Sequence, residues 1–388
     1  MTPMKIKTLA PEQVKNKVVL VRVDFNVPIK NGVVQDSTRI LEALPTIKFL
    51  LKNGAKRVHL LAHLGRPKGE AKPEFSLRPV AAKLEELLKK LVEFRPDFTA
   101  GNGEVQLHEN VRFDPREKKN DPAFAQEILE NTGAEVFVND GFGVSHRAHA
   151  SVVGFAKKVP CLAGKLVQKE IEALSPFRSD QKMPGLSILA GGVKMETKVA
   201  VLRHFATTAE NILLGGALGT TFLAAQGFDV GESLYEPEQF ETAREILEIA
   251  KKNQTAIHLP VDVECADDPD GESVYVPIED VTGSMKIFDI GPRTIASFRE
   301  VLTHSQTVIW NGPMGFFEKQ PFDNGTTDLA RTLTKLSDVQ TILGGGDTIS
   351  AIAHANVPAA AFTHISTGGG AMLEFLEGKA LPGIEVLK

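Results

Sequence analysis

The sequence predicts an α/β protein built from two doubly wound domains with parallel sheets, joined by a connecting helix. Short runs of β-branched residues alternate with longer amphipathic stretches through both halves of the 388-residue chain. A helical pattern at 165–174 is followed by the Pro-, Ser- and charge-rich segment 175–184, which is typical of a domain boundary. At roughly 150 residues per domain, the length suffices for two such domains.

The strand and helix signals follow one another in a regular order. The first half carries expected strands at 18–25, 57–62 and 135–139 and expected helices at 37–52 and 76–91. The second half carries expected strands at 186–190, 211–214, 307–310, 341–343 and 362–365 and a helix at 196–206. This alternation is typical of parallel sheets that helices cover on both faces. Ligands of such sheets bind at the carboxyl ends of the strands, so residues that directly follow strands are the site candidates.

The composition excludes several classes of protein. Hydrophobic residues make up 42% and charged residues 24% of the chain, close to globular averages, which excludes a disordered chain. No apolar run reaches about 18 residues, so no membrane span is expected. The first residues lack the apolar stretch of a secretory signal, and Cys161 and Cys265 provide neither a disulfide framework nor a cysteine zinc site. We therefore expect a protein of a reducing compartment.

The net charge of −5 conceals an asymmetry between the halves. Residues 1–175 contain 28 Lys and Arg against 21 Asp and Glu, a balance of +7, whereas residues 176–388 contain 16 against 28, a balance of −12. A basic half indicates an anionic small ligand or a nucleic acid, although uneven surface charge explains the same numbers. The basic residues are scattered and lack interleaved aromatic residues, which argues against a nucleic acid.

Cationic and polar residues follow four strand ends in the basic half, those of the three expected strands given above and of a further strand that runs into 109–113. Such residues meet at one edge of a parallel sheet, and arginine binds phosphate and carboxylate groups bidentately. A small ligand with both groups would fit them. Any one of these arginines alone is more typical of a solvated surface, whereas four strand ends that each carry a cation favour a site. The candidates are Asp24, Asn26, Arg39, His63, Arg66, Arg112 and Arg147, while His59 and His149 are expected to be packing or surface histidines.

Five glycine-rich turns follow strands in the second half. They lie at 191–194, 215–219, 311–315, 344–348 and 367–370. Glycine lets backbone amides approach a phosphate, and a following helix N-terminus adds a favourable dipole. One such turn usually reflects tight packing, but several in one domain indicate a nucleotide site. The P-loop pattern GxxxxGK(S/T) is absent, and no GxGxxG follows the first strand of either half.

Four side chains in this half are candidates for nucleotide contacts. Lys194 and Lys198 lie four residues apart at the expected start of a helix, so we expect them to share a helical face. Two cations there oppose the helix dipole and an anion between them would offset it; a solvated pair is the alternative. Asp347 follows three glycines and could hold magnesium beside nucleotide phosphates, or cap a helix. Glu318 is a candidate acceptor for a ribose hydroxyl, or an exposed residue.

Together these motifs resemble one family, the phosphoglycerate kinases. They occur in the family's order, cover nearly the whole chain, and several are long enough to be very specific. The segments that carry the resemblance are RVDFNVP (22–28), HLGRP (63–67), ENVRF (109–113), VND with FG and HRAHAS (138–151), GG with two lysines (191–198), WNGPMG with FE (310–318), GGGDT (344–348) and HISTGGGA with LE, LEGK and LPG (364–383).

The resemblance implies two Rossmann-like domains and a glycolytic phosphotransferase. An N-terminal phosphoglycerate-binding domain would span 1–170, a C-terminal Mg-nucleotide-binding domain 171–375, and a segment of about 376–388 would pack back on the first domain. The implied reaction is the reversible transfer of the acyl phosphate of 1,3-bisphosphoglycerate to Mg-ADP, which gives 3-phosphoglycerate and ATP. The implied cofactor is Mg²⁺, and the implied partners are these small molecules, without nucleic acid or membrane. The enzyme would be a cytoplasmic monomer.

The resemblance also assigns roles residue by residue. The phosphoglycerate site would comprise Asp24, Phe25, Asn26, Arg39, His63, Leu64, Gly65, Arg66, Arg112 and Arg147. The nucleotide site would comprise Lys194, Lys198, Gly291, Glu318, Gly345, Gly346, Asp347 and Thr348, with Asp347 on the metal. The transferring phosphoryl group would be stabilised by Arg39, Lys198 and the amides of Gly369 and Gly370. Such groups supply positioning and charge, which suits an in-line transfer that needs no protein nucleophile.

The sequence departs from the family pattern at a few loop positions. Ala62 stands where Ser is common, and Gly141 replaces the usual Ala. Further differences occur at Val193, Met195 and Glu196 and at the pair Leu218 and Gly219. None removes a charged residue with an assigned role, so the differences concern the loops and leave the chemistry intact.

Two other functional classes are compatible with this architecture. A nicotinamide-dependent dehydrogenase is disfavoured by the missing GxGxxG. A non-catalytic two-lobed binding protein would close on an anion without turnover, but the glycine-rich half and Asp347 favour an enzyme. For a kinase we expect the domains to close about 165–185, bring Arg39 and Lys198 to the same phosphoryl group and exclude water, because hydrolysis of the acyl phosphate would otherwise compete.

Overall fold

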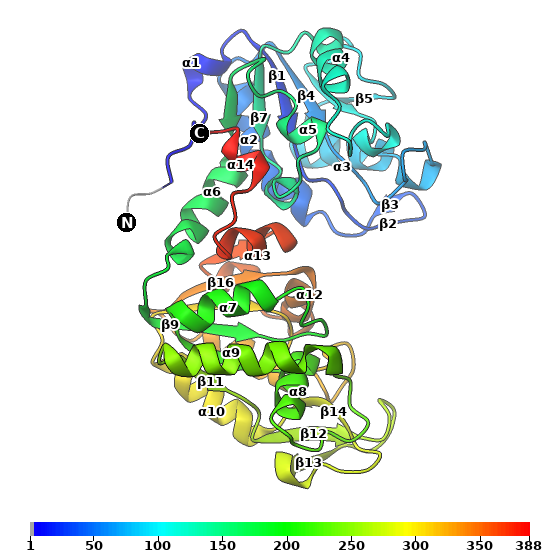
Figure 1. The fold of residues 1–388 in the computed structure, drawn as a ribbon. Coiled ribbons are helices and arrows are strands. Elements are labelled where there is room, and N and C mark those ends of the chain that lie inside the picture. The colour runs from blue at the N-terminus through cyan, green and yellow to red at the C-terminus, as the bar shows by residue number, and fades with distance from the viewer. Residues whose placement is uncertain (1–3) are drawn as a thin grey trace. The chain divides into compact units, whose positions relative to one another are not determined.

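The computed structural model describes residues 4–388, which divide into two compact units (Figure 1). The first unit comprises the chain up to Pro176 together with Lys379–Lys388, and the second comprises Phe177–Gly378. Each unit has its own six-stranded parallel sheet, so the predicted α/β class is confirmed. None of the helices in residues 4–388 combines the length and the hydropathy that a membrane span needs.

The first unit is built on a sheet with the strand order β5-β6-β4-β1-β7-β8. The central strand β1 pairs with β4 on one side and β7 on the other, which places Arg22 opposite both Leu61 and Asn139. The chain moves outward from β1 in one direction and then in the other, and a doubly wound sheet binds its ligand at such a switch point. The strands are β1 (Val18–Arg22), β4 (Arg57–Leu61), β5 (Val92–Arg95), β6 (Val105–His108), β7 (Val136–Asn139) and β8 (Cys161–Ala163), beside a hairpin of β2 (Ile29–Lys30) and β3 (Val33–Val34).

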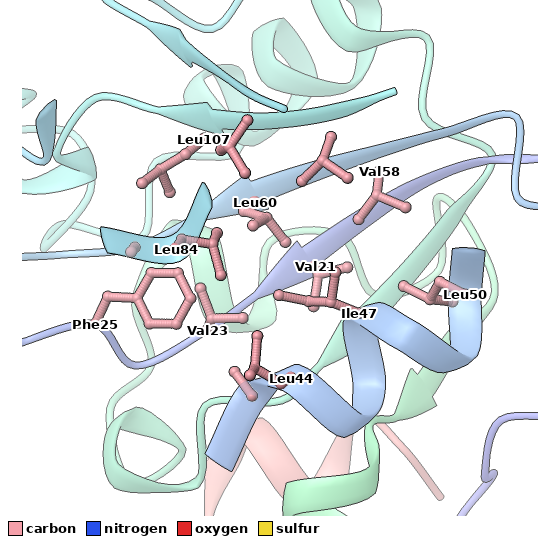
Figure 2. Close-up of a cluster of buried hydrophobic side chains, with 14 of the residues drawn as sticks. Val21, Val23, Phe25, Leu44, Ile47, Leu50, Val58, Leu60, Leu84 and Leu107 are labelled. Carbon is pink, nitrogen blue, oxygen red and sulfur yellow. The ribbon is translucent and has the colours of Figure 1, made fainter. Parts of the chain in front are cut away.

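Helices cover both faces of this sheet. The crossovers from β1 to β4 and from β6 to β7 run in opposite directions, so right-handed connections place α2 and α4 on opposite faces. Between α2, α3 and the strands lies a core of buried aliphatic side chains around Phe25 (Figure 2). The helices are α1 (Pro11–Val14), α2 (Thr38–Lys52), α3 (Arg78–Leu88), α4 (Pro122–Thr132), α5 (Ala150–Val153), α6 (Lys165–Leu174) and α14 (Pro382–Glu385), with 3-10 turns at Pro73–Phe75, Val111–Phe113 and Phe142–Val144.

Two consecutive residues at the end of β7 hold the segments through which the chain leaves and re-enters this unit. Asn139 Nδ2 donates to the carbonyl of Gly383, at 2.8 Å, within α14. Asp140 Oδ1 accepts from the amide of Leu166, at 3.0 Å, in the first turn of α6. Both side chains are fully buried. The C-terminal segment is therefore an integral part of the first unit.

The second unit contains a parallel sheet with the strand order β11-β10-β9-β15-β16-β17. The chain again moves outward from a central strand, β9, in both directions. A separate antiparallel sheet, in the order β13-β12-β14, lies between β11 and β15 in the sequence and was not predicted. The strands are β9 (Met183–Ala190), β10 (Ala209–Leu214), β11 (Ala256–His258), β12 (Asp262–Ala266), β13 (Val274–Pro277), β14 (Lys286–Ile290), β15 (Thr307–Asn311), β16 (Gln340–Gly344) and β17 (His364–Ser366).

The helices of the second unit begin directly after the glycine-rich turns in several places. Gly216, Gly346 and Gly370 are each the first residue of a helix. The helices are α7 (Val199–Thr208), α8 (Gly216–Ala225), α9 (Phe240–Lys252), α10 (Pro292–Thr303), α11 (Asn324–Leu333), α12 (Gly346–His354) and α13 (Gly370–Leu376), with 3-10 turns at Ser175–Arg178, Pro237–Gln239, Ile278–Asp280 and Ala359–Ala361. The helix predicted at 196–206 is α7, which begins three residues later than predicted, at Val199.

Candidate active site

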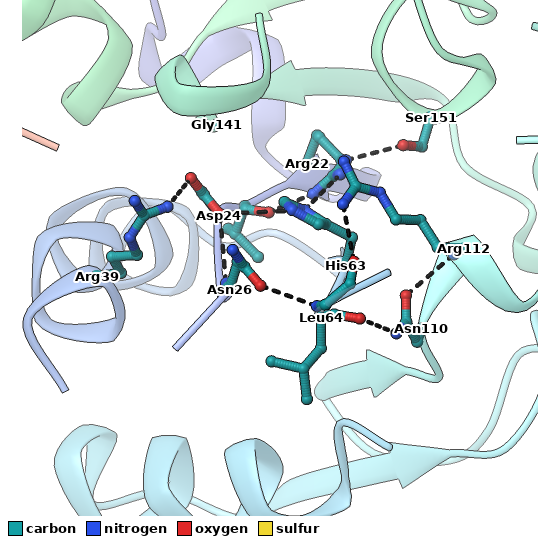
Figure 3. Close-up of polar contacts among 12 residues, drawn as sticks. Arg22, Asp24, Asn26, Arg39, His63, Leu64, Asn110, Arg112, Gly141 and Ser151 are labelled. Carbon is teal, nitrogen blue, oxygen red and sulfur yellow. Dashed lines mark hydrogen bonds and ion pairs between the residues drawn. The ribbon is translucent and has the colours of Figure 1, made fainter. Parts of the chain in front are cut away.

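The carboxyl edge of the first sheet carries a cluster of basic residues at the switch point (Figure 3). Asp24 follows β1, His63 follows β4, and Arg39 lies in the first turn of α2. Arg112 lies in the 3-10 turn Val111–Phe113. The amide of Val111 donates to the carbonyl of Ala62 at 3.1 Å, which attaches this turn to the residue that directly follows β4. Because the strands are parallel neighbours, their ends deliver these side chains to one place.

Hydrogen bonds join the strand ends of this cluster to one another. Arg39 forms an ion pair with Asp24 Oδ2, and Asp24 Oδ1 lies 4.0 Å from His63 Nδ1. Asn26 Oδ1 accepts from the amide of Gly65 at 2.9 Å, so the loops after β1 and β4 are attached to each other. These contacts thus bring together residues that lie up to 39 positions apart in the sequence.

Arg112 is a half-buried cation in the same cluster. Its guanidinium donates to the carbonyl of Gly65 at 2.9 Å, while its Nε is buried and has no hydrogen-bond partner within residues 4–388. Burial, and next the charge of Arg22, lower the pKa of Arg112 to about 10. The cation is therefore held in a position where its charge is poorly compensated, which favours the binding of an anion.

Arg22, which the sequence analysis did not select, lies beneath the cluster. It is the last residue of β1 and is fully buried. Its Nε donates to Ser151 Oγ at 2.8 Å, and one terminal nitrogen contacts His63 Nδ1 at 3.2 Å. Burial is the main cause that lowers the pKa of His63 well below its ordinary value, and Arg22 is the largest of the charges that add to it. His63 is therefore neutral.

Glu117 supplies a buried negative charge behind the arginines. It is fully buried, and its carboxylate accepts from the amide of Ser151 at 2.9 Å and from Ser151 Oγ at 2.7 Å. His149 Nδ1 lies 3.7 Å away from it. Burial raises the pKa of Glu117, while Arg22 and the two hydrogen bonds from Ser151 oppose that shift. Glu117 lies in a run of charged residues, and such a run is typical of a solvated surface, so no pattern in the sequence marks it as a buried residue of the site.

The remaining residues assigned to this site lie in different environments. Phe25 and Leu64 are buried in the hydrophobic core, so only their main-chain groups are available to a ligand. Arg66 and Arg147 are exposed. Arg147 is close enough to Arg112 for its charge to lower the pKa of that residue. The cluster therefore has buried and exposed arginines around a neutral histidine, which can bind a ligand that carries several negative charges.

The second unit contains a cavity of about 560 Å³ at the ends of its strands. Residues of α8, β14, the loop 313–318 and the start of α12 line it, among them Ala217, Phe288, Glu318 and Asp347. Three of its apolar residues are also largely exposed, namely Val193, Leu234 and Phe316. An apolar slot with acidic groups at its edge suits a planar ring that carries hydroxyl groups, such as a nucleoside.

Close approach of two glycine-rich turns shapes one wall of this cavity. Gly216 has a φ of +61°, and a Cβ on it would lie 2.8 Å from the amide nitrogen of Gly192. Only glycine fits there without strain. Gly216 also begins α8, and two amides of that first turn hold the neighbouring loops: the amide of Gly216 donates to the carbonyl of Met314 at 2.7 Å, and that of Leu218 to the carbonyl of Gly192 at 3.1 Å. These contacts fix the two glycine-rich turns against each other at the wall of the cavity.

Lys198 is the nearly buried cation of this unit. A Cβ on Gly192, which lines the cavity, would lie 3.6 Å from Lys198 Nζ. Burial lowers the pKa of Lys198, and the carboxylates of Asp347 and Glu236 oppose that shift. The residue caps the N-terminus of α7, where a cation opposes the helix dipole. An anion bound beside Lys198 would compensate both the burial and the dipole.

Lys194 does not share a helical face with Lys198, contrary to the prediction. The backbone from Met195 to Lys198 forms a turn, with the amide of Lys198 donating to the carbonyl of Met195 at 2.7 Å, and α7 begins only at Val199. Glu236 accepts from the amide of Met195 and holds this turn. Lys194 is exposed in the preceding loop.

The turn at 344–348 is held by hydrogen bonds from its neighbours. Thr348 Oγ1 accepts from the amide of Gly312 at 2.7 Å and donates to the carbonyl of Gly344 at 2.8 Å. Gly345 has a φ of +95°, and a Cβ on it would lie 2.8 Å from Asn311 Nδ2. These contacts bring the loop after β15 to the start of α12. Thr348 is fully buried, so its side chain supports the turn.

The other glycines assigned to the nucleotide site differ in position. Gly291 caps α10 and is buried, and a Cβ on it would lie 2.4 Å from the carboxyl carbon of Asp262, so packing alone requires a glycine there. It does not line the cavity, whereas its neighbour Ile290 does. Gly346, at the start of α12, has open space around it, and so have Gly369 and Gly370 at the start of α13. The side of the backbone on which a side chain would lie is therefore open at these two helix starts.

The chain is similar over nearly its whole length to known proteins of one family. A family profile described as "Phosphoglycerate kinase" matches residues 9–379. The "Phosphoglycerate kinase" of Thermosipho africanus is 47% identical over 98% of this chain and 97% of that protein. The "Phosphoglycerate kinase" of Clostridioides difficile is 44% identical over 100% of this chain and 99% of that protein.

Solved structures give the same result. The structure of phosphoglycerate kinase from Coxiella burnetii has a TM-score of 0.88 and 37% identity, and the match covers 99% of both chains. The phosphoglycerate kinase of Pyrococcus horikoshii has a TM-score of 0.83 and 32% identity, over 97% of this chain and 96% of that one.

Proposed function

Because the chain belongs to the phosphoglycerate kinase family, we propose that it transfers the acyl phosphate of 1,3-bisphosphoglycerate to Mg-ADP. The products are 3-phosphoglycerate and ATP, and the reaction is reversible. The observation that carries this proposal is the cluster at the carboxyl edge of the first sheet, where Arg39, His63 and Arg112 lie around Asp24 and Asn26. A compact ligand with a phosphate, a carboxylate and a hydroxyl group matches that combination of donors and acceptors.

The first unit binds the phosphoglycerate in this proposal. Arginine forks bind the phosphate and the carboxylate, and the exposed Arg66 and Arg147 contribute alongside the half-buried Arg112. Neutral His63 donates a hydrogen bond without adding charge. Asp24 accepts from a hydroxyl group, since a carboxylate would repel a phosphate at the same position.

The second unit binds the nucleotide. The base occupies the apolar slot between α8 and β14, Glu318 accepts from the ribose, and the phosphates lie near Lys198 and the start of α12. Lys194, exposed in the loop before Lys198, contributes a further positive charge.

Asp347 holds the magnesium ion together with the nucleotide phosphates. Its carboxylate is exposed, lines the cavity, and lies close enough to Lys198 to affect its pKa. Residues 4–388 contain no group of three or more His, Cys, Asp or Glu side chains that could enclose a metal ion. The single carboxylate of Asp347 fits Mg²⁺, because this ion commonly binds one or two carboxylates and completes its shell with phosphate oxygens and water. When bound, the ion neutralises charge on the phosphates.

Catalysis in this proposal consists of positioning and charge stabilisation. The terminal β-phosphate oxygen of ADP attacks the acyl phosphorus, the bond from phosphorus to the carboxylate oxygen breaks, and the phosphoglycerate leaves as a carboxylate. Arg39, Lys198 and the amides of Gly369 and Gly370 donate to the oxygens of the transferring group. No protein nucleophile and no general base is needed, because neither reactant must lose a proton for this step.

In-line transfer requires the two reactants to be in contact while water is excluded. We therefore propose that binding of both substrates closes the enzyme by bending within residues 165–185, the segment that contains α6. Cytoplasmic location and a monomeric state belong to the same proposal.

A coupled assay tests the proposed function. ATP formed from ADP, Mg²⁺ and enzymatically generated 1,3-bisphosphoglycerate is measured with hexokinase and glucose-6-phosphate dehydrogenase. We expect ATP formation that depends on all three components. No ATP formation by folded protein would contradict the proposal, and an absorbance change with a nicotinamide cofactor alone would favour a dehydrogenase.

A further inference from the structure

A continuous chain of hydrogen bonds leads from Glu117 to the ring of His63. Ser151 Oγ donates to Glu117 Oε1 at 2.7 Å and accepts from Arg22 Nε at 2.8 Å. A terminal nitrogen of Arg22 contacts His63 Nδ1 at 3.2 Å. Three of the four residues are fully buried, and His63 is only 4% exposed (Figure 3 shows the part from Ser151 to His63). The four residues come from different segments of the first unit, so the fold assembles this chain.

The contact with Arg22 determines which ring nitrogen of His63 carries the proton. A guanidinium group can only donate hydrogen bonds, so His63 Nδ1 must accept and therefore has no proton. The proton of the neutral ring lies on Nε2. Within residues 4–388 no protein group accepts from Nε2, so this N–H is available to a ligand. The orientation of Arg22 is thus the cause of a defined donor in the binding cluster.

Arg22 itself needs a nearby negative charge in order to remain buried. Asp24 is the second charge that stabilises the cationic form of Arg22, but its carboxylate is already engaged in an ion pair with Arg39. Glu117 is the largest of the charges that stabilise the cationic form of Arg22. Arg22 also donates to the carbonyls of Val23 and Leu61, but neither of these carries a charge. A fully buried cation without a counter-charge is strongly unfavourable, so loss of Glu117 removes the main charge that keeps Arg22 buried in this orientation.

We propose that Glu117 and Ser151 are positioning residues that hold Arg22 beneath the basic cluster and thereby fix His63 as the Nε2–H tautomer. This inference rests on the proposed function only where it makes Nε2–H a donor to the phosphoglycerate. The tautomer itself is a property of the ligand-free protein. Glu117 and Ser151 touch neither substrate, and they act through Arg22.

A purely structural role for Glu117 is the competing explanation. Its side chain accepts from the amide of Ser151 and its carbonyl accepts from the amide of Ala150, both in the first turn of α5. A residue that only caps α5 affects unfolding without changing the chemistry of His63. A measurement on the imidazole ring separates the two roles.

The tautomer is measured by two-dimensional ¹H–¹⁵N NMR of ligand-free protein labelled with ¹⁵N-histidine, with the His63 signals assigned by His63→Gln. We expect wild-type His63 to show one protonated nitrogen, Nε2, across the range of neutral pH. Glu117→Gln and Ser151→Ala should both give averaged signals from a mixture of tautomers. If His63 remains a pure Nε2–H tautomer in both folded variants, the proposal is wrong.

Glu127→Gln is the matched control, because Glu127 also binds an arginine, Arg116 at 2.8 Å, but on the surface and outside this chain of bonds. It should leave the His63 signals unchanged. Should Glu117→Gln fail to fold, Ser151→Ala removes a single oxygen atom and carries the test alone. An equal change in the Glu127→Gln spectrum would overturn the assignment of the effect to Glu117.

Kinetics provide the second measurement. In Ser151→Ala we expect the KM for 3-phosphoglycerate to rise about tenfold, as for loss of one hydrogen bond to a charged group, with the KM for Mg-ATP unchanged. Equal rises in both KM values would contradict a role at His63. If wild-type protein shows no kinase activity and yet the NMR result is as expected, the positioning proposal stands and the proposed function fails.

Discussion

Arg39 in the first turn of α2 forms an ion pair with Asp24, which follows β1 fifteen residues earlier in the chain. Asp24 is 6% exposed and Arg39 is 33% exposed, so a buried carboxylate holds one terminal nitrogen of a guanidinium group that is still partly open to solvent. The pair keeps Arg39 at the edge of the basic cluster before any ligand binds. A phosphoryl group that arrives there meets an arginine already in place, so little conformational freedom is lost on binding.

Substitution Arg39→Ala should lower kcat by about 10³-fold or more, by analogy with other arginines that stabilise a transferring phosphoryl group. The KM values should change much less, because the interaction is strongest in the transition state. Steady-state kinetics of ATP formation provide the measurement. A rise in KM with an unchanged kcat would show that Arg39 only binds substrate.

Substitution Asp347→Asn should weaken the binding of Mg-ADP and leave the binding of 3-phosphoglycerate unchanged. The carboxylate is the proposed magnesium ligand, and its charge also supports the cationic form of Lys198, so its loss lowers the pKa of Lys198 further. Isothermal titration calorimetry with each ligand separately measures both effects. Asp338→Asn, at an exposed position of the same unit, is the control. An equal loss of affinity for both ligands would contradict the division of the two sites.

The sequence was sufficient to predict the elements whose pattern is strong and local. The helix predicted at 165–174 is α6, and the strand predicted at 57–62 is β4 with one residue fewer. The end of a helix was harder to place. The helix predicted at 76–91 ends at Leu88, because Lys89 adopts a left-handed conformation with a φ of +53°.

The antiparallel sheet of the second unit had no comparable signal. Its strand β13 is short, and Val274 and Tyr275 on it are about half exposed. A strand of this kind lacks both the continuous apolar run of a buried strand and a clear alternation. Its pairing with β12 depends on contacts that a local pattern does not encode.

The candidate site could be predicted only where its residues face the ligand. Arg39, His63 and Arg112 follow strands or begin helices, and the parallel sheet explains why they meet. Arg22 and Glu117 could not be found in this way. Arg22 lies inside a strand pattern and Glu117 in a charged run, and burial of either depends on its distant partners.

Stability should fall as the pH rises because of Asp140, and Asp140→Asn should abolish that dependence. Burial raises the pKa of Asp140 from an ordinary 3.8 to about 8, against the hydrogen bonds that it accepts at the start of α6. Between pH 4 and 8 the native protein therefore binds more protons at Asp140 than the unfolded chain does. The stability that protonated Asp140 contributes is lost over this range and is gone once the pH has risen through 8.

Urea unfolding of wild type and Asp140→Asn at pH 6 and pH 9 measures this effect. The variant should gain stability relative to wild type on going from pH 6 to pH 9. Asp121→Asn removes another carboxylate at a helix N-terminus, that of α4, and controls for the loss of a negative charge there, because asparagine caps a helix as well as aspartate does. A difference between variant and wild type that is the same at both pH values would show that Asp140 is ionised throughout.

Acid should destabilise the first unit through a pair of buried histidines. His59 Nδ1 and His108 Nε2 lie 2.8 Å apart, and His108 Nδ1 lies 2.7 Å from the carbonyl of Asp97. A carbonyl only accepts, so His108 carries its proton on Nδ1 and accepts from His59 at Nε2. Both rings are therefore neutral, and a second proton on His108 would break the bond between them.

Burial lowers the pKa of His59 to about 3 and that of His108 to about 4. The unfolded chain takes up these two protons near pH 6.5, whereas the native protein does not, so stability should fall as the pH decreases from about 6.5 to 4. Each histidine contributes a slope of up to about 1.4 kcal/mol per pH unit. His59→Gln keeps a donor toward His108 but removes one titrating group, so it should reduce the slope by about one proton. Urea unfolding from pH 7 to 4 measures the slope of stability against pH, and His304→Gln, at an exposed position, is the control. An unchanged slope in His59→Gln would mean that the native protein protonates His59 as readily as the unfolded chain does.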